Sequence, residues 1–237
     1  MRTAAALAAL GALASWPSGA ACAADLVSPI GVDSTPSAPW RVTGLPEQRV
    51  PLTRFSVTER DGVPALRIES DHAYGLLLHP LSGVHAGSLA WRWRVDRPVT
   101  GADLYRKSGD DAALKVCALF DMPLARVPFL ERQWLRLASA RYGQTLPTAT
   151  LCYVWEPGLP AGSVLHNAFS HRLRLITAQH AVGAWNSEQH DLAADFRRVF
   201  GDETDEVPPL RAIAIGADTD NTGSHSLAWL DGLRLVP

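Results

Sequence analysis

A polar stretch near the C-terminus, GADTDNTGSH at residues 216–225, concentrates oxygen-bearing side chains suited to binding a cation or a polar ligand. Asp218, Asp220 and Asn221 offer hard oxygen atoms, and calcium takes several such ligands. The stretch matches the first half of an EF-hand loop, but its twelfth position is Trp229 instead of Glu. We therefore favour a polar turn, in which Asp and Asn side chains bond to nearby backbone. A calcium site completed by distant ligands is the alternative.

A second group of charged residues precedes an apolar run in RKSGDDAALKV, residues 106–116. Lys107 stands near the acid pair Asp110 and Asp111, at the expected entrance of a strand. Adjacent residues in a strand point to opposite faces, so one carboxylate would enter a cleft and the other would face solvent. Such a carboxylate binds sugar hydroxyls or acts as an acid or base. The alternative is a solvated loop with a weak ion pair.

The segment LCYVWEPG, residues 151–158, combines aromatic residues with a carboxylate at a strand end. Tyr153 and Trp155 share one face of the strand, and Glu156 follows directly. A Trp beside a carboxylate holds a sugar well, because the ring stacks on its apolar face and the acid accepts its hydroxyls. Core packing is the alternative, and we favour it for Tyr153.

The sequence gives only a weak indication of a catalytic carboxylate pair. Glu188 and Asp191 lie three residues apart in SEQHD, so they share a face if this segment is helical. Paired carboxylates catalyse glycoside hydrolysis at suitable separations, but we favour acids that stabilise a helix N-terminus. The chain has no G-x-S-x-G, no HExxH, no CxxC pair and no glycine-rich phosphate loop before a helix. The motifs therefore favour a protein without catalysis.

The elements that must position these residues are mainly short strands. SLAWRWRVD, residues 88–96, alternates apolar and polar residues, which is typical of a strand with one buried face. Asp61 and Gly62 predict a hairpin between two further strands. One segment follows helical spacing instead, with apolar residues at i, i+4, i+7 and i+8 from Leu192. We predict a mainly β fold, an antiparallel β-sandwich or jelly roll with one short amphipathic α-helix at about residues 187–200.

Composition places this fold in one exported domain. The chain has 237 residues, 47% of them hydrophobic, and a net charge of −2, which gives no indication of nucleic-acid binding. Arg2 and the Ala/Leu run after it predict a signal peptide at residues 1–23, with lipidation of Cys22 as the minor alternative. We expect an extended leader at residues 24–50 and a single β-sandwich domain at residues 51–237. No later segment predicts a membrane span, and the mature protein would be periplasmic or secreted.

Two cysteines remain after cleavage, Cys117 and Cys152, both in strand-like runs. An oxidising compartment permits a disulfide between them. Two buried free thiols are the alternative, because sequence does not give the Cα separation that a bridge needs.

Five motifs in order, LAWRWRVD, KSGDDAALKVCALFD, LCYVWE, GAWNSEQHDLAADFRRVFG and IAIGADTDNTGSHSLAWLDGLRL, resemble the DUF3047 family of exported bacterial proteins. The resemblance covers roughly residues 40 to 237 and implies export and a β-sandwich, but no established reaction. The family pattern has an aromatic residue where Cys117 stands and an arginine near His190. Its polar motif positions match a set of residues in this chain: Lys107, Asp110, Asp111, Asp218, Asp220 and Asn221.

We predict that these residues, together with Trp155 and Glu156, bind carbohydrate or a cell-envelope glycan without catalysis. Two alternatives remain: a glycoside hydrolase or lyase that uses a carboxylate pair from Asp110, Asp111 and Glu156, and a structural envelope protein without a small ligand. We predict no resident cofactor, with calcium as the alternative.

Overall fold

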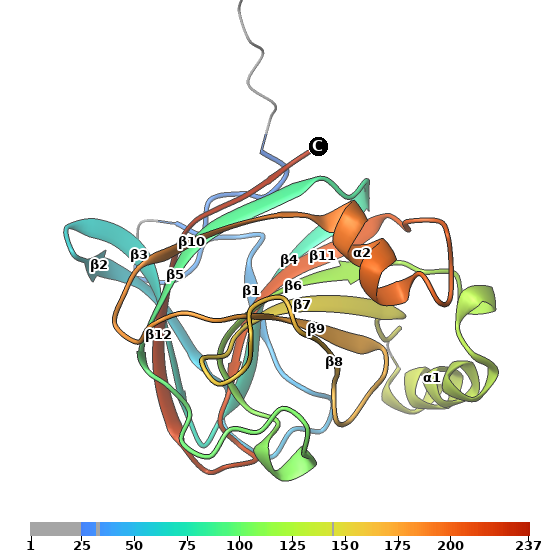
Figure 1. The fold of residues 1–237 in the computed structure, drawn as a ribbon, viewed down its shortest axis with the longest axis horizontal. Helices are drawn as coiled ribbons and strands as arrows, with labels where there is room; N and C mark the ends of the chain where they lie inside the picture. Colours follow the sequence, from blue (N-terminus) through green and yellow to red (C-terminus); the bar gives the residue numbers. More distant parts are fainter. Residues whose placement is uncertain (1–24, 32–33, 144) are drawn as a thin grey trace, which may run out of the picture.

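The computed structural model describes residues 25–31, 34–143 and 145–237, so the predicted signal peptide lies outside the described residues. Two β-sheets face each other across a shared apolar core (Figure 1). The prediction of a mainly β sandwich is confirmed. Part of the predicted leader joins the sandwich, because β1 (Arg41–Thr43) pairs with β4 (Tyr74–Val84).

The larger sheet has seven strands in the order β1-β4-β11-β6-β7-β9-β8. Its remaining strands are β6 (Ala112–Phe120), β7 (Ala149–Trp155), β8 (Val164–His166), β9 (Leu173–Ala178) and β11 (Leu210–Asp218). The expectation of a wholly antiparallel sandwich is wrong at one place, because β7 and β9 run parallel. The chain leaves β7, forms β8 at the sheet edge and returns as β9 between them, which gives β9 the direction of β7.

The smaller sheet has five strands in the order β10-β5-β12-β3-β2. They are β2 (Arg54–Arg60), β3 (Val63–Asp71), β5 (Ser88–Arg97), β10 (Asn186–Asp191) and β12 (His225–Val236). The predicted hairpin forms between β2 and β3, with φ of 53° at Asp61 and 81° at Gly62. The alternation predicted for β5 is also present, since Trp91 and Trp93 are buried in the core while Arg92 is exposed.

The predicted helix at about residues 187–200 is confirmed from Leu192 onwards and wrong in its first five residues. Residues 186–191 form β10, and helix α2 spans only Leu192–Phe200. The Asp191 side chain caps it by accepting hydrogen bonds from the backbone N–H groups of Ala193 and Ala194. The structure also has a longer helix that the sequence analysis did not predict, α1 (Phe129–Tyr142), which lies outside both sheets (Figure 1). Two short 3-10 helices complete the elements of the described residues, η1 (Lys107–Gly109) and η2 (Leu124–Arg126).

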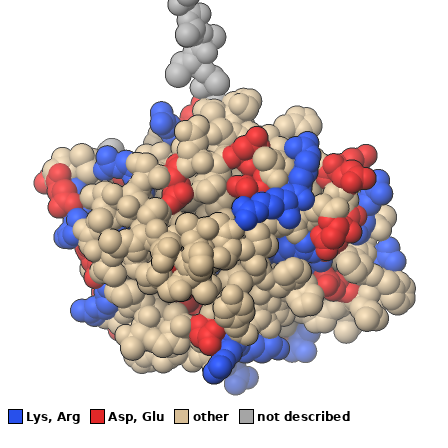
Figure 2. Space-filling model, viewed as in Figure 1, with Lys and Arg blue, Asp and Glu red and all other residues tan. Residues whose placement is uncertain are grey.

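Apolar side chains lie on both faces of the larger sheet. The main core fills the space between the sheets and includes the buried face of α2. A second apolar cluster covers the outer face of the larger sheet and includes Cys117 and Cys152, which the structure joins in a disulfide. On the face shown in Figure 2, acidic and basic side chains are interspersed. Neither α-helix in the described part of the chain has the length and apolar character that crossing a membrane requires.

Candidate ligand-binding site

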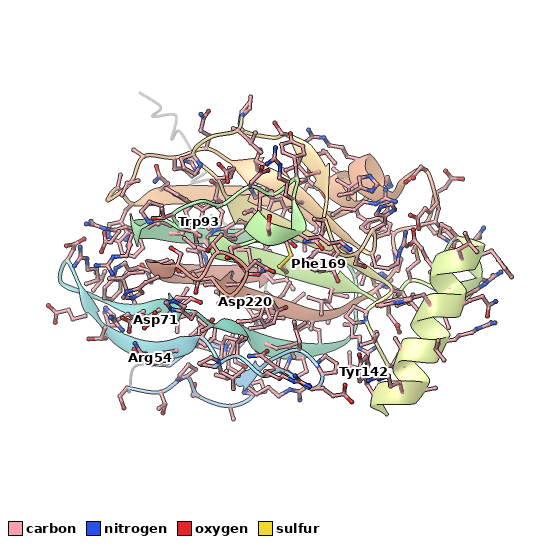
Figure 3. All side chains as sticks on the ribbon, turned by 90° about the horizontal axis from the view of Figure 1, so that it is seen from below. Arg54, Asp71, Trp93, Tyr142, Phe169 and Asp220 are labelled. Carbon is pink, nitrogen blue, oxygen red and sulfur yellow. A yellow bond between two sulfur atoms is a disulfide. The ribbon has the colours of Figure 1, made fainter. Side chains whose placement is uncertain are left out.

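Pairing between β6 and β11 brings the two predicted acidic motifs together. Asp110 and Asp111 directly precede β6, and Asp218 ends β11 opposite Ala112 in the antiparallel register. Oxygen atoms of Asp111, Asp218 and Asp220 lie within 4.8 Å of one another. Figure 3 shows Asp220 near the centre of the molecule in the view from below. We call Asp110, Asp111, Asp218 and Asp220 the acidic cluster.

Asp111 holds the loop between β11 and β12. Its Oδ1 accepts hydrogen bonds from the backbone N–H and the side-chain amide of Asn221, at 3.2 and 3.1 Å. Its Oδ2 accepts from the backbone N–H and the hydroxyl of Thr222, at 2.7 and 2.6 Å. Four donors on one buried carboxylate fix the loop against the start of β6. The polar stretch 216–225 therefore contains a turn, as favoured from the sequence, but the main acceptor comes from the other motif.

A buried ion pair stands beside this turn. Lys115, on β6, donates from Nζ to Oδ2 of Asp218 at 2.5 Å, and the two side chains are only 10% and 7% exposed. Oδ1 of Asp218 accepts from the backbone N–H of Ala112 at 2.8 Å. Burial alone would lower the pKa of Lys115, but the Asp218 carboxylate outweighs it and raises that pKa, so the lysine stays charged. Lys115 thus places a positive charge directly beside the acidic cluster.

The remaining carboxylates of the cluster bind protons more readily than usual. Burial raises the pKa of Asp110, against the opposing effects of Lys115 and of the hydrogen bond that Asn167 donates at 2.5 Å. Burial, followed by the charges of Asp218 and Asp111, raises the pKa of Asp220. The four carboxylates of the acidic cluster have one buried lysine beside them, Lys115, so the cluster favours hydroxyl donors, a proton or a cation.

The residues that would hold a cation are Asp111, Asp218 and Asp220. Oδ1 of Asp220 is buried and has no hydrogen-bond partner among the described residues. Both oxygens of Asp111 and of Asp218, however, already accept hydrogen bonds, and Lys115 lies where a cation would neutralise Asp218. The donor set is therefore poorly suited to calcium, which needs several free oxygen ligands.

A groove on the outer face of the larger sheet reaches the acidic cluster through Lys115. This outer groove has a volume of about 470 Å³. Its floor includes aliphatic side chains of β4, alanines of β11 and the Cys117–Cys152 disulfide. Tyr74 and Lys115 line it towards the acidic cluster, and Arg41, Thr150 and Arg211 supply further polar groups. An apolar concave surface with a few polar groups is the usual form of a small-molecule site.

The other predicted ligand-binding residues, Lys107, Trp155 and Glu156, are less well placed to contact a ligand. Lys107 is exposed on η1 and lies over the ring of Phe169 at 5.2 Å, and it makes no ion pair with Asp110 or Asp111 within 4.0 Å. Trp155 is only 3% exposed and belongs to the core between the sheets, so its ring faces are not free for stacking. Glu156 accepts a hydrogen bond from the backbone N–H of Gly158, as in a turn. A separate cavity of about 190 Å³ brings Asp111, Trp155 and Glu156 into one lining.

The second carboxylate pair does not form. Glu188 lies on β10, not on a helix, and accepts from His190 at 3.0 Å and from His180. Asp191 caps α2 on the opposite side of the strand. The helix-face pair considered for glycoside hydrolysis is therefore wrong. The interpretation of Asp191 as an acid at a helix N-terminus is correct.

Sequence reasoning missed the residues of the outer groove, above all Lys115. The available signal was a lone lysine inside the apolar run AALKVCALF, all of whose residues are buried. A charge in such a run requires a buried partner. That requirement points to an acid on a neighbouring strand, although it does not identify which one.

Comparisons with known proteins identify the family. A family model described as "Protein of unknown function (DUF3047)" matches residues 38–234. The chain belongs to the DUF3047 family. The match confirms the resemblance found in the ordered motifs and includes every residue of the acidic cluster. No curated protein matches the chain.

Several solved structures are distantly similar to this DUF3047 protein. A family 29 carbohydrate-binding module with a single substitution has a TM-score of 0.38 at 11% identity, covering 91% of both chains. The xyloglucanase domain of NopAA, a type three effector from Sinorhizobium fredii, in complex with cellobiose, has a TM-score of 0.42 at 10% identity, covering 84% of this chain and 98% of that one. CBM28, a module specific for non-crystalline cellulose, has a TM-score of 0.32 at 13% identity, covering 77% and 80%.

Proposed function

We propose that this protein is an exported, non-catalytic β-sandwich that binds a carbohydrate in the outer groove. The observation that carries the proposal is an apolar groove of about 470 Å³ that has the buried Lys115 of the Lys115–Asp218 pair in its wall. Sugar rings have apolar C–H faces and hydroxyl edges. The aliphatic floor of the groove would contact the C–H faces. Lys115, Tyr74 and Thr150 would provide hydrogen-bond donors and acceptors for the hydroxyl groups.

The contacts of the carboxylates favour binding over catalysis. Asp111 is saturated by four donors, and Asp218 is paired with Lys115, so neither has a free oxygen for proton transfer to a substrate. Asp110 is bound to Asn167, and Glu156 to the turn that follows it. A hydrolase or lyase would need two of these groups released from their partners.

The Cys117–Cys152 disulfide supports the export part of the proposal. Disulfides persist in oxidising compartments and are rare in the cytosol. Together with the apolar, Arg-led N-terminus, the disulfide favours a periplasmic or secreted location. Fusion of residues 1–30 to a reporter that is active only after export tests this part, and a reporter retained in the cytoplasm would contradict it.

Affinity electrophoresis tests carbohydrate binding directly. We would run the protein through gels that contain soluble β-glucan, xyloglucan, mannan or peptidoglycan fragments. Thr150→Trp fills the outer groove from β7 and should weaken binding about tenfold, which corresponds to about 1.4 kcal/mol. Thr58→Trp is the matched control, because Thr58 is exposed on β2 of the other sheet.

Retardation by at least one polysaccharide, weakened about tenfold in Thr150→Trp and unchanged in Thr58→Trp, is the expected result. No retardation by any polysaccharide, or equal retardation of both variants, would refute binding in the outer groove. Release of reducing ends that disappears in Asp111→Asn would instead favour the hydrolase alternative.

A further inference from the structure

Helix α1 carries an apolar stripe that faces solvent. Leu130, Trp134 and Leu137 recur at i, i+4 and i+7, which places them on one face of a helix. They are 79%, 56% and 72% exposed, and Phe129 beside them is 62% exposed. The opposite face, with Leu135 and Ala138, is the one that packs on the protein. Figure 3 shows α1 at one edge of the molecule, with its outer side turned away from both sheets.

Large apolar side chains exposed together usually mark an interaction surface. Exposed aromatic and aliphatic residues elsewhere in the described chain are scattered over different strands and loops, as at Val63, Phe169 and Val182. On α1 they are consecutive along one helix face. We call Phe129, Leu130, Trp134 and Leu137 the apolar stripe of α1.

The charges around this stripe are basic. Arg132 and Arg136 lie on α1 and have no acidic partner within 4.0 Å among the described residues. Arg136 is exposed, whereas Arg132 is half-buried and its guanidinium lies over the ring of Phe129 at 5.6 Å. Arg126 precedes the helix and Arg141 lies in its last turn, and they make only exposed contacts, with Glu206 and Glu47. Glu131 is the one acidic residue of α1, and the buried Arg172 neutralises its charge by an ion pair.

We propose that the apolar stripe of α1 and its arginines dock on a membrane surface that carries anionic lipid headgroups. Interfacial helices bury Trp, Phe and Leu at the boundary between headgroups and acyl chains, and keep arginines at the phosphate level. Juxtamembrane arginines add attraction to anionic lipids. The helix lies on the surface and does not span it.

This contact would also orient the outer groove. Residues 145–147, which follow α1 after residue 144, line that groove. A surface-bound α1 therefore holds the groove beside the membrane. The proposal does not depend on the chemistry of the ligand in the groove.

Fluorescence of Trp134 tests the proposal in the full chain. Residues 1–24 include an apolar run that can itself associate with lipid, so the measurement must report on α1 specifically. We would mix the protein with vesicles of phosphatidylcholine alone, or with 30% phosphatidylglycerol, each with and without brominated acyl chains. The signal of Trp134 is the spectrum of the wild type minus that of Trp134→Phe.

We expect Trp134 emission to shift to the blue and to be quenched by brominated chains in the anionic vesicles. Leu130→Ser/Leu137→Ser should abolish the quenching, and Arg132→Gln/Arg136→Gln should weaken vesicle binding about tenfold at low salt. Val182→Ser and Arg234→Gln are the matched controls, because both residues are exposed outside α1.

Unquenched Trp134 in anionic vesicles would overturn the proposal. So would a dimer in sedimentation equilibrium that disappears in Leu130→Ser/Leu137→Ser, because a second copy would then cover the stripe. Equal quenching in the two vesicle types would also count against it, since the arginines would have no role.

Discussion

Replacing Lys115 by methionine should destabilise the protein strongly, because the substitution leaves Asp218 buried without its counter-ion. The Asp218 side chain is 7% exposed, and apart from Lys115 its side chain accepts only the backbone N–H of Ala112. Its other charged neighbours are carboxylates. Breaking one side of a buried pair costs about 3–5 kcal/mol. For a chain of this size, that loss lowers the urea midpoint by about 1.5–2 M.

The loss of unfolding free energy in Lys115→Met should depend on pH, and the pKa of Asp218 sets the direction of that dependence. Burial raises the pKa of Asp218 above its ordinary value, and removal of Lys115 takes away the main effect that opposes this. The native state then binds this proton more tightly than the unfolded state does. Stability therefore rises as pH falls through the folded-state pKa, and the deficit of the variant is smaller at pH 5 than at pH 8.

Urea unfolding followed by tryptophan fluorescence provides the assay. Lys107→Met is the matched control, since Lys107 is the only other lysine and is exposed on η1. Lys115→Met/Asp218→Asn should recover most of the lost stability, because the amide keeps an acceptor for Ala112 and carries no charge. A deficit below about 1 kcal/mol at pH 7, or one that does not change with pH, would refute the buried pair.

Three further predictions address other parts of the molecule. Arg67, with Arg54 and His225, lowers the pKa of Glu69 to about 2, so Glu69→Gln should lower the free energy of unfolding by about 1 kcal/mol at pH 7. That difference should vanish as pH falls from 4.5 to 2, and equal urea midpoints at pH 7 would contradict it. Cys117→Ala/Cys152→Ala should cost about 3–4 kcal/mol, because the disulfide closes a separation of 35 residues; an unchanged midpoint would show that the bridge does not form. Calcium should change the melting temperature by less than about 1 °C relative to EDTA, and a saturable rise lost in Asp220→Ala would establish a metal site instead.

Strand periodicity predicted most of the sandwich, and the failures have local causes. The sequence predicted helix for β10 because its inward residues, Glu188 and His190, are polar and give no apolar alternation. Their partners, His180 and Asp195, lie outside the strand, so the segment alone contains no strand signal. Helix α1 was missed because part of its apolar surface faces solvent, which broadens the amphipathic pattern.

The acidic cluster shows how far the site could be predicted. Both acidic motifs were identified from the order of their residues, but their meeting depends on the register that sets Asp218 opposite Ala112. Trp155 was assigned to a binding face because a strand end gives no information about which sheet face is covered. The outer groove was not foreseen, since β6 is buried on both faces and an apolar floor resembles core in the sequence.

Substitutions of the Lys115–Asp218 pair distinguish a carbohydrate-binding function from a purely structural one. Asp111 has a structural use, because its four hydrogen bonds fix a loop. An apolar residue at position 115 would suit an otherwise apolar strand, and replacing a buried ion pair by apolar groups is often neutral or stabilising. Stability therefore does not explain why the Lys115–Asp218 pair is present. Lys115 lies in the wall of the outer groove, where it would bind a ligand. Accordingly, Lys115→Met/Asp218→Leu should fold with near wild-type stability and lose polysaccharide retardation, whereas Asp111→Asn should lose stability and keep binding. Retained binding in the double variant would favour the structural alternative for this pair.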